Sequence, residues 1–128
     1  MYIFPITVEF EDIDSYGIIH HPKVLYYFER ARVHFFLDNE LDLNAIKFGV
    51  VLRSVNIQYK IPLLFMDKID IEIKSNNIEK FRFDLNYRIL KDGKSAVIST
   101  IEFCIIDLET KRLIEIPEKI KVLLEKLK

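Results

Sequence analysis

The chain contains few of the residues that interrupt or cross-link a protein fold. Its 128 residues include one cysteine, no tryptophan, three glycines and four prolines. The single cysteine, Cys104, cannot form an intrachain disulfide, and its apolar neighbours predict a buried thiol that packs as a small hydrophobe. Few glycines and prolines predict a chain dense in regular structure, without linkers or repeats. The length predicts a single domain over residues 1–128.

The chain also lacks an excess of charge of either sign. Its 19 basic and 20 acidic residues leave a net charge of −1, which predicts no bulk attraction to nucleic acid or to an anionic membrane. Residues 1–6 have neither the basic nor the apolar region of a signal peptide, and no apolar run approaches the length of a membrane span. We therefore expect a cytoplasmic protein with reduced thiols, no nucleic-acid partner and no integral membrane segment.

Hydrophobic periodicity predicts the order of the elements. Residues 5–11 alternate as a half-buried strand, and the period becomes helical from Pro22 to about residue 38. Four segments then return to period two, near residues 51–59, 69–73, 81–89 and 95–107, with Asp92-Gly93 as a hairpin turn before the last. We expect that last strand to be central and covered on both faces. A short strand at 112–116 and a helix from Pro117, docked on the domain or on a partner subunit, complete the chain.

This order predicts an α+β fold in which an antiparallel sheet wraps around one long helix. So small a sheet leaves an edge strand and, we expect, one apolar face open. Pairing two subunits edge to edge would remove this liability, and we therefore expect at least a dimer.

The residues with the most chemical potential lie in one short segment, between the first strand and the helix. Two acids, Asp12 and Asp14, precede a bend at Gly17, and His21 stands immediately before Pro22 at the helix start. A carboxylate can attack a carbonyl or activate water, and free N–H groups at a helix start can polarise a carbonyl oxygen. The segment therefore predicts acyl chemistry.

Residues 12–22, Asp-Ile-Asp-Ser-Tyr-Gly-Ile-Ile-His-His-Pro, resemble a known signature. It is that of the hotdog-fold acyl-CoA thioesterases of the 4-hydroxybenzoyl-CoA thioesterase family, which includes the bacterial acyl-CoA thioesterases associated with the Tol-Pal system. Residues 28–32, Phe-Glu-Arg-Ala-Arg, look like the helix motif of this family. Residues 55–62 followed by Asp67 look like its second strand and turn. The resemblance covers nearly the whole chain.

The resemblance implies a hotdog fold and hydrolysis of an acyl-CoA thioester to the free acid and CoA. It implies no cofactor beyond the CoA of the substrate, and a homo-oligomer that is a dimer or a dimer of dimers, a homotetramer. Asp14 matches the catalytic carboxylate, as nucleophile or general base. His21 matches the histidine before the helix, whose side chain positions water or substrate and whose backbone N–H looks like the donor to the thioester carbonyl. Gly17 matches the glycine of the bend.

Other residues of the segment complete the expected site. Tyr16, Gly17, Ile19 and Pro22 are the expected substrate-binding residues. No metal is expected, because the adjacent His20 and His21 face different ways. Elsewhere in the chain, four cations are candidates for contacts with the phosphates of CoA: Arg53, Lys60, Lys80 and Arg82.

The sequence departs from the family pattern at positions 10, 13, 23, 24 and 66, which are Phe10, Ile13, Lys23, Val24 and Met66. The departures at positions 10, 13 and 24 motivate an alternative to the thioesterase, a non-catalytic hotdog protein that binds acyl thioesters or a protein partner. A hotdog dehydratase or hydratase acting on acyl thioesters is a third interpretation. Turnover of acyl-CoA distinguishes the thioesterase from the non-catalytic binding protein.

Overall fold

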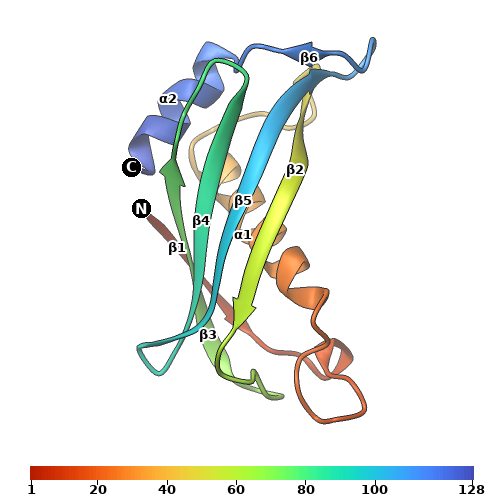
Figure 1. Cartoon of the computed structure of the whole chain (residues 1–128), viewed down its shortest axis with the longest axis vertical. Coiled ribbons are helices and arrows are strands. Elements are labelled where there is room, and N and C mark those ends of the chain that lie inside the picture. Colours follow the sequence, from red (N-terminus) through yellow and green to blue (C-terminus); the bar gives the residue numbers. More distant parts are fainter.

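The computed structural model describes residues 1–128, and it shows one antiparallel sheet wrapped over a long helix (Figure 1). Helix α1 spans Lys23–Asp38, and α2 spans Glu118–Lys126. The strands are β1 (Tyr2–Thr7), β2 (Phe48–Tyr59), β3 (Lys68–Asn76), β4 (Arg82–Lys91), β5 (Lys94–Asp107) and β6 (Leu113–Ile114). Their order across the sheet is β1-β3-β4-β5-β2, with β6 paired to the end of β5. The predicted α+β architecture is confirmed.

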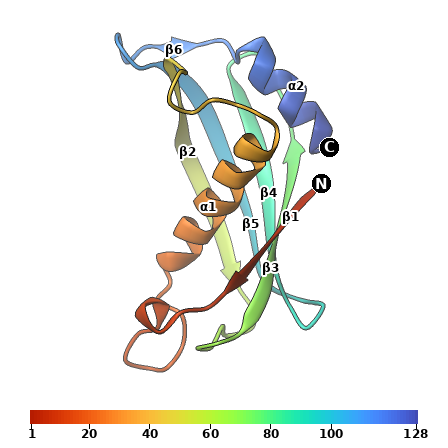
Figure 2. The same cartoon turned by 180° about the vertical axis from the view of Figure 1, so that it is seen from behind.

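The core lies between α1 and one face of the sheet (Figure 2). The apolar stripe of α1 supplies Val24, Phe28 and Ala31, all fully buried. Phe28 stacks on Tyr87 of β4, with ring centroids 4.3 Å apart. Because burying such side chains is the main favourable term in folding, this stripe holds α1 in place and so orients its N-terminus.

The first strand ends earlier than its alternating pattern predicts. β1 stops at Thr7, and a 3-10 helix, η1 (Phe10–Asp12), follows it. The side chain of Asp12 accepts the Glu9 N–H at 3.1 Å, and the Asp12 N–H bonds the Glu9 carbonyl at 3.0 Å. These local bonds close a turn and leave Phe10 76% exposed. Pro5 is tolerated inside β1 because β1 is an outermost strand of the sheet.

The β4–β5 hairpin confirms the predicted turn, since Asp92 and Gly93 have φ angles of 52° and 76°. β5 is central, between β4 and β2, but consecutive residues are buried only in two parts of it, at Ala96 and Val97 near its start and from Phe103 to Ile105 near its end. Between these parts, Thr100 is exposed on the face opposite α1. That face is polar, so the expectation of an open apolar face was wrong.

The last helix docks on its own domain. Four apolar side chains on one side of it are buried: Ile120, Leu123, Leu124 and Leu127. The Ser75 hydroxyl of β3 donates to the Leu124 carbonyl at 2.5 Å.

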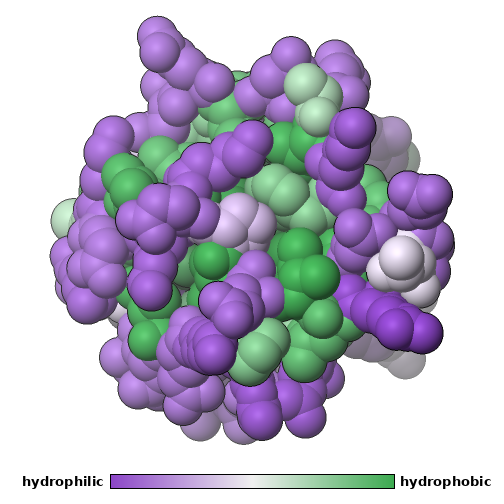
Figure 3. Space-filling model, turned by 90° about the horizontal axis from the view of Figure 1, so that it is seen from above, coloured by the Kyte–Doolittle hydropathy of each residue, from purple (hydrophilic) through white to green (hydrophobic).

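Seen from above, the molecule shows apolar surface between rims of hydrophilic side chains (Figure 3). Neither helix is both long and apolar enough to span a membrane.

Candidate active site

The segment between η1 and α1 is a tight loop closed by its own backbone. The Asp14 N–H donates to the Ile18 carbonyl at 2.9 Å, and the Gly17 N–H donates to the Asp14 carbonyl at 3.1 Å. Gly17 has a φ of +79°, a conformation that glycine adopts at little cost. Ile13 and Ile19 form an isolated β-bridge at the base of the loop. The loop therefore presents Asp14 in a defined position.

Asp12 supports this loop from inside the protein. It is 5% exposed, and it accepts a hydrogen bond from the Tyr27 hydroxyl at 2.6 Å. Burial, together with the carboxylate of Asp12, raises the pKa of Tyr27, so this hydroxyl remains a donor at neutral pH. Lys23 lies 3.7 Å from the other carboxylate oxygen of Asp12. Asp12 is thus a buried structural acid and not a solvated one.

The carboxylate of Asp14 is oriented at one oxygen and free at the other. Oδ1 accepts the Tyr16 N–H at 2.8 Å, while Oδ2 has no hydrogen-bond partner within the chain. The residue is partly exposed. A carboxylate held in this way keeps one oxygen available to attack a carbonyl or to accept a proton.

His21 brings a free backbone donor to the same place. The preceding carbonyl, that of His20, accepts the Lys23 N–H at 2.8 Å in the first turn of α1. The His21 N–H belongs to the same peptide group and points the opposite way, and it has no acceptor within the chain. The next residue, Pro22, has no N–H at all. An N–H left free at a helix start is suited to a carbonyl oxygen that develops negative charge.

Asp14 and His21 line one pocket of about 290 Å³. The residues that face them come from the end of β2, the loop after it and β5. The complete lining is Asp14, Ile18, Ile19, His21, Tyr59, Lys60, Ile61, Pro62, Leu63 and Val97. The pocket therefore joins a carboxylate and a free N–H to a mainly aliphatic wall.

The structure brings some of the expected substrate-binding residues to this pocket and leaves others outside it. Ile19 lines it. Tyr16 is 86% exposed, and neither it nor Gly17 belongs to the lining. Pro22 lines a neighbouring cavity of about 490 Å³, which lies between α1, β2 and β5.

Tyr59 is a residue of the site that the sequence pattern did not single out. Its hydroxyl donates to the His21 carbonyl at 2.9 Å, across a separation of 38 residues. Partial burial raises the pKa of Tyr59, which keeps the hydroxyl protonated. In the sequence, Tyr59 is one more apolar member of an alternating strand, and only the return of β2 toward the helix start gives it this contact.

The four cations considered for CoA phosphates do not form one cluster. Lys60 lines the pocket of Asp14. Arg53, Lys80 and Arg82 share a different pocket, where Arg53 and Arg82 lie 3.5 and 4.0 Å from the carboxylate of Glu102. These two arginines are therefore partly neutralised within the chain.

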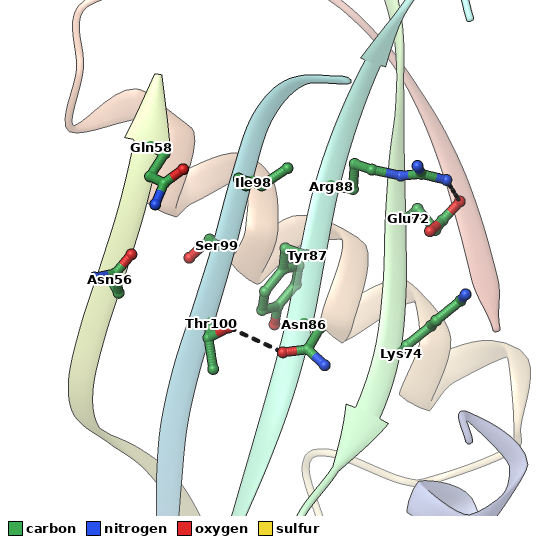
Figure 4. A pocket seen from close by; sticks show the side chains of 10 residues that line it. All are labelled: Asn56, Gln58, Glu72, Lys74, Asn86, Tyr87, Arg88, Ile98, Ser99 and Thr100. Carbon is green, nitrogen blue, oxygen red and sulfur yellow. Dashed lines mark hydrogen bonds and ion pairs between the residues drawn. The ribbon is translucent and has the colours of Figure 1, made fainter. Parts of the chain in front are cut away.

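A further pocket lies on the sheet face opposite α1, and Figure 4 shows its polar lining. Its buried acid, Glu72, is paired with Arg88 at 3.0 Å, and Thr100 bonds Asn86 at 3.0 Å. These four side chains bond one another in pairs, and the pocket has no equivalent of the carboxylate and the free N–H found at Asp14 and His21.

No group of three or more histidine, cysteine, aspartate or glutamate side chains is arranged to hold a metal ion anywhere in the chain.

A long central helix wrapped by an antiparallel sheet, with an acid and a free N–H at the helix entry, defines the class of hotdog thioester hydrolases. Residues 8–124 match the thioesterase-like superfamily, and the chain belongs to this family. It is similar to an acyl-CoA thioesterase, YbgC, of Haemophilus influenzae, at 22% identity over 98% of this chain and 95% of the relative.

Solved structures share the fold over nearly their whole length. A hypothetical protein from Aquifex aeolicus superposes with a TM-score of 0.91 at 24% identity, covering 97% of this chain and 99% of that one. A 1,4-dihydroxy-2-naphthoyl-CoA thioesterase from Synechocystis gives 0.89 at 17% identity, covering 98% and 96%. At these identities the likeness shows the hotdog fold, which confirms the fold expected from the sequence.

Proposed function

We propose that this protein hydrolyses an acyl-CoA thioester to the free acid and CoA, with Asp14 as the reacting carboxylate. The observation that carries the proposal is that Asp14, which has one carboxylate oxygen without a partner, and His21, whose N–H has no acceptor, line the same pocket. The aliphatic wall beside them suits the acyl group of such a substrate, because apolar groups leave water favourably.

The proposed reaction begins with the thioester carbonyl oxygen accepting the His21 N–H. As nucleophile, Asp14 Oδ2 bonds to the carbonyl carbon, the carbon–sulfur bond breaks and the thiolate of CoA leaves and takes up a proton. Water then hydrolyses the acyl-aspartyl anhydride to the free acid and regenerates the carboxylate. As general base, Asp14 instead removes a proton from water while that water attacks the same carbon; the carbon–sulfur bond then breaks, and the thiolate of CoA leaves and takes up the proton held by Asp14. The His21 imidazole positions the water or the substrate in either case.

Replacement of Asp14 by asparagine tests this proposal. The asparagine side chain retains an acceptor for the Tyr16 N–H, so we expect the fold to persist while thiol release from acyl-CoA falls by about 10²–10⁴-fold. The assay is thiol release from short, medium and long acyl-CoAs and benzoyl-type CoAs, with thermal unfolding as the check on folding. The matched control is Glu11→Gln, an exposed acid of the same region that does not line the pocket. Full activity of Asp14→Asn would overturn the proposal.

The two roles of Asp14 differ in whether a covalent intermediate forms. Single turnover in ¹⁸O-labelled water, followed by mass analysis of the peptide that carries Asp14, detects label in the carboxylate when water opens the anhydride at the aspartyl carbon. Hydroxylamine added during turnover gives a hydroxamate on the Asp14 side chain when it opens the anhydride at the aspartyl carbon, a product that its direct attack on the thioester cannot give. Neither the label nor this hydroxamate is expected when Asp14 acts as a general base.

We also propose that the protein works as a homo-oligomer. The outer edge of β2 pairs with no strand, and three apolar side chains of this strand are exposed: Val51 by 36%, Leu52 by 45% and Val55 by 38%. An unpaired edge of 12 residues is a strong template for pairing with a second copy. The cavity beside the α1 side of β2 lies next to this edge, so a partner there would also complete its wall.

A further inference from the structure

Tyr59 is the only residue of the sheet whose side chain hydrogen-bonds the segment that carries Asp14 and His21. Its hydroxyl reaches the His21 carbonyl at 2.9 Å. The other side-chain hydrogen bonds and ion pairs of the stretch between β1 and α1 come from α1 or from the stretch itself. Tyr59 stands opposite Val97 of β5, at the end of β2, and both residues line the pocket.

This hydrogen bond acts on the peptide groups that surround the free donor. The His20 carbonyl, on one side, is held by the Lys23 N–H. The His21 carbonyl, on the other side, accepts the Tyr59 hydroxyl, while its helical bond to the Val24 N–H is long at 3.3 Å. With Tyr59 in place, the peptide group that contains the His21 N–H and the peptide group after it are each held through their carbonyl oxygen, which sets the direction of this N–H. Without the Tyr59 hydroxyl, the His21 carbonyl keeps only the long bond to the Val24 N–H, in a first helical turn, where helix ends fray.

We propose that Tyr59 is a positioning residue for the thioester carbonyl, acting through the His21 carbonyl to keep the His21 N–H aimed into the pocket. The inference rests on the proposed function, because it assigns a role to the donor that the hydrolysis uses. Tyr59 also ties His21 to β2, the strand whose outer edge pairs with no other strand. The direction of the His21 N–H therefore depends on this edge strand and not on the helix alone.

Tyr59→Phe removes the hydroxyl and keeps the ring that lines the pocket. We expect kcat for acyl-CoA hydrolysis to fall by about 3- to 10-fold, the range that one hydrogen bond supplies, with KM nearly unchanged. We expect kcat to change more than KM because the His21 N–H stabilises the substrate most when the carbonyl oxygen becomes negative in the transition state. The matched control is Tyr2→Phe, which removes a tyrosine hydroxyl that donates to Asp38 at 2.6 Å, away from the pocket, and leaves kcat as it was.

A second readout does not depend on activity. The amide resonance of His21 in a ¹H–¹⁵N spectrum is expected to shift or broaden in Tyr59→Phe and to stay in place in Tyr2→Phe. If the wild-type protein is active and Tyr59→Phe leaves both kcat and this resonance unchanged, the positioning role is overturned and the proposed function stands. If the wild-type protein releases no thiol from any acyl-CoA, the proposed function is overturned, and the resonance alone then tests the hold of Tyr59 on His21.

Discussion

Two aspartates two positions apart, Asp12 and Asp14, end in opposite environments. Asp12 is buried with a tyrosine hydroxyl on its carboxylate, and Asp14 is partly exposed with one oxygen free. The turn of η1 causes the difference, because it points the first acid into the protein beneath α1. Lys23, one of the residues that depart from the family pattern, contributes to the surroundings of Asp12, since its ammonium lies 3.7 Å from the Asp12 carboxylate. At the residue scale, function depends on which polar groups are satisfied and which are left free.

Ser99 of β5 carries a buried hydroxyl without a hydrogen-bond partner within the chain, which costs stability. We expect Ser99→Ala to raise the free energy of unfolding by roughly 0.5–1 kcal/mol in urea denaturation. The matched control is Ser75→Ala on β3, which loses the bond to the Leu124 carbonyl and is expected to lower that free energy by about 1 kcal/mol. Equal destabilisation by the two changes would contradict this account.

At the scale of elements, the loop after β2 is held by an ion pair to the end of β4. Asp67 lies 2.7 Å from the Lys91 ammonium and accepts the Leu64 N–H at 2.7 Å. Partial burial alone would raise the pKa of Asp67, but these two donors outweigh it and hold the pKa below its usual value. The loop contributes Leu63 to the pocket wall, so the ion pair also braces the site.

Asp67→Asn is expected to make the protein less stable at neutral pH and less sensitive to acid. A lowered folded-state pKa stabilises the fold above the unfolded value of ~3.9 and ceases to do so as pH falls through the folded value. We therefore expect the variant to lose on the order of 1 kcal/mol at pH 7 and the difference to vanish in strong acid. Urea denaturation across this pH range measures it. The control, Asp92→Asn, changes an exposed acid without an ion pair, and an equal loss there would contradict the assignment.

The elements themselves were largely predictable, and the exceptions have a physical cause. α1 and the β4–β5 hairpin follow from a helical stripe and from Asp92-Gly93, which are local signals. The end of β1 was wrong because hydrogen bonds between Glu9 and Asp12 compete with strand pairing, and an alternating pattern cannot reveal them. The polarity of the outer sheet face was likewise misjudged, since it depends on how neighbouring strands align.

At the scale of the whole molecule, the open edge of β2 predicts assembly. We expect light scattering coupled to size-exclusion chromatography to give a mass of at least twice the 15.3 kDa of the chain. Val55→Lys places a charge on this strand, where it disfavours pairing, and is expected to shift the protein toward the monomer. Lys74→Glu on β3, exposed and away from β2, is the control. A monomeric wild-type protein at assay concentration would refute the oligomer.

The amino-acid sequence by itself determined the helix, the strands and the loop that presents Asp14, because these follow from local periodicity, proline and glycine. It also carried, through the resemblance of residues 12–22, the family to which the chain belongs. Only the tertiary structure decided which side chains surround that acid. One pocket is lined by His21 together with Tyr59, Leu63 and Val97, because β2, the loop after it and β5 return to the start of α1. Such long-range neighbours depend on strand register and helix packing, which no local pattern contains.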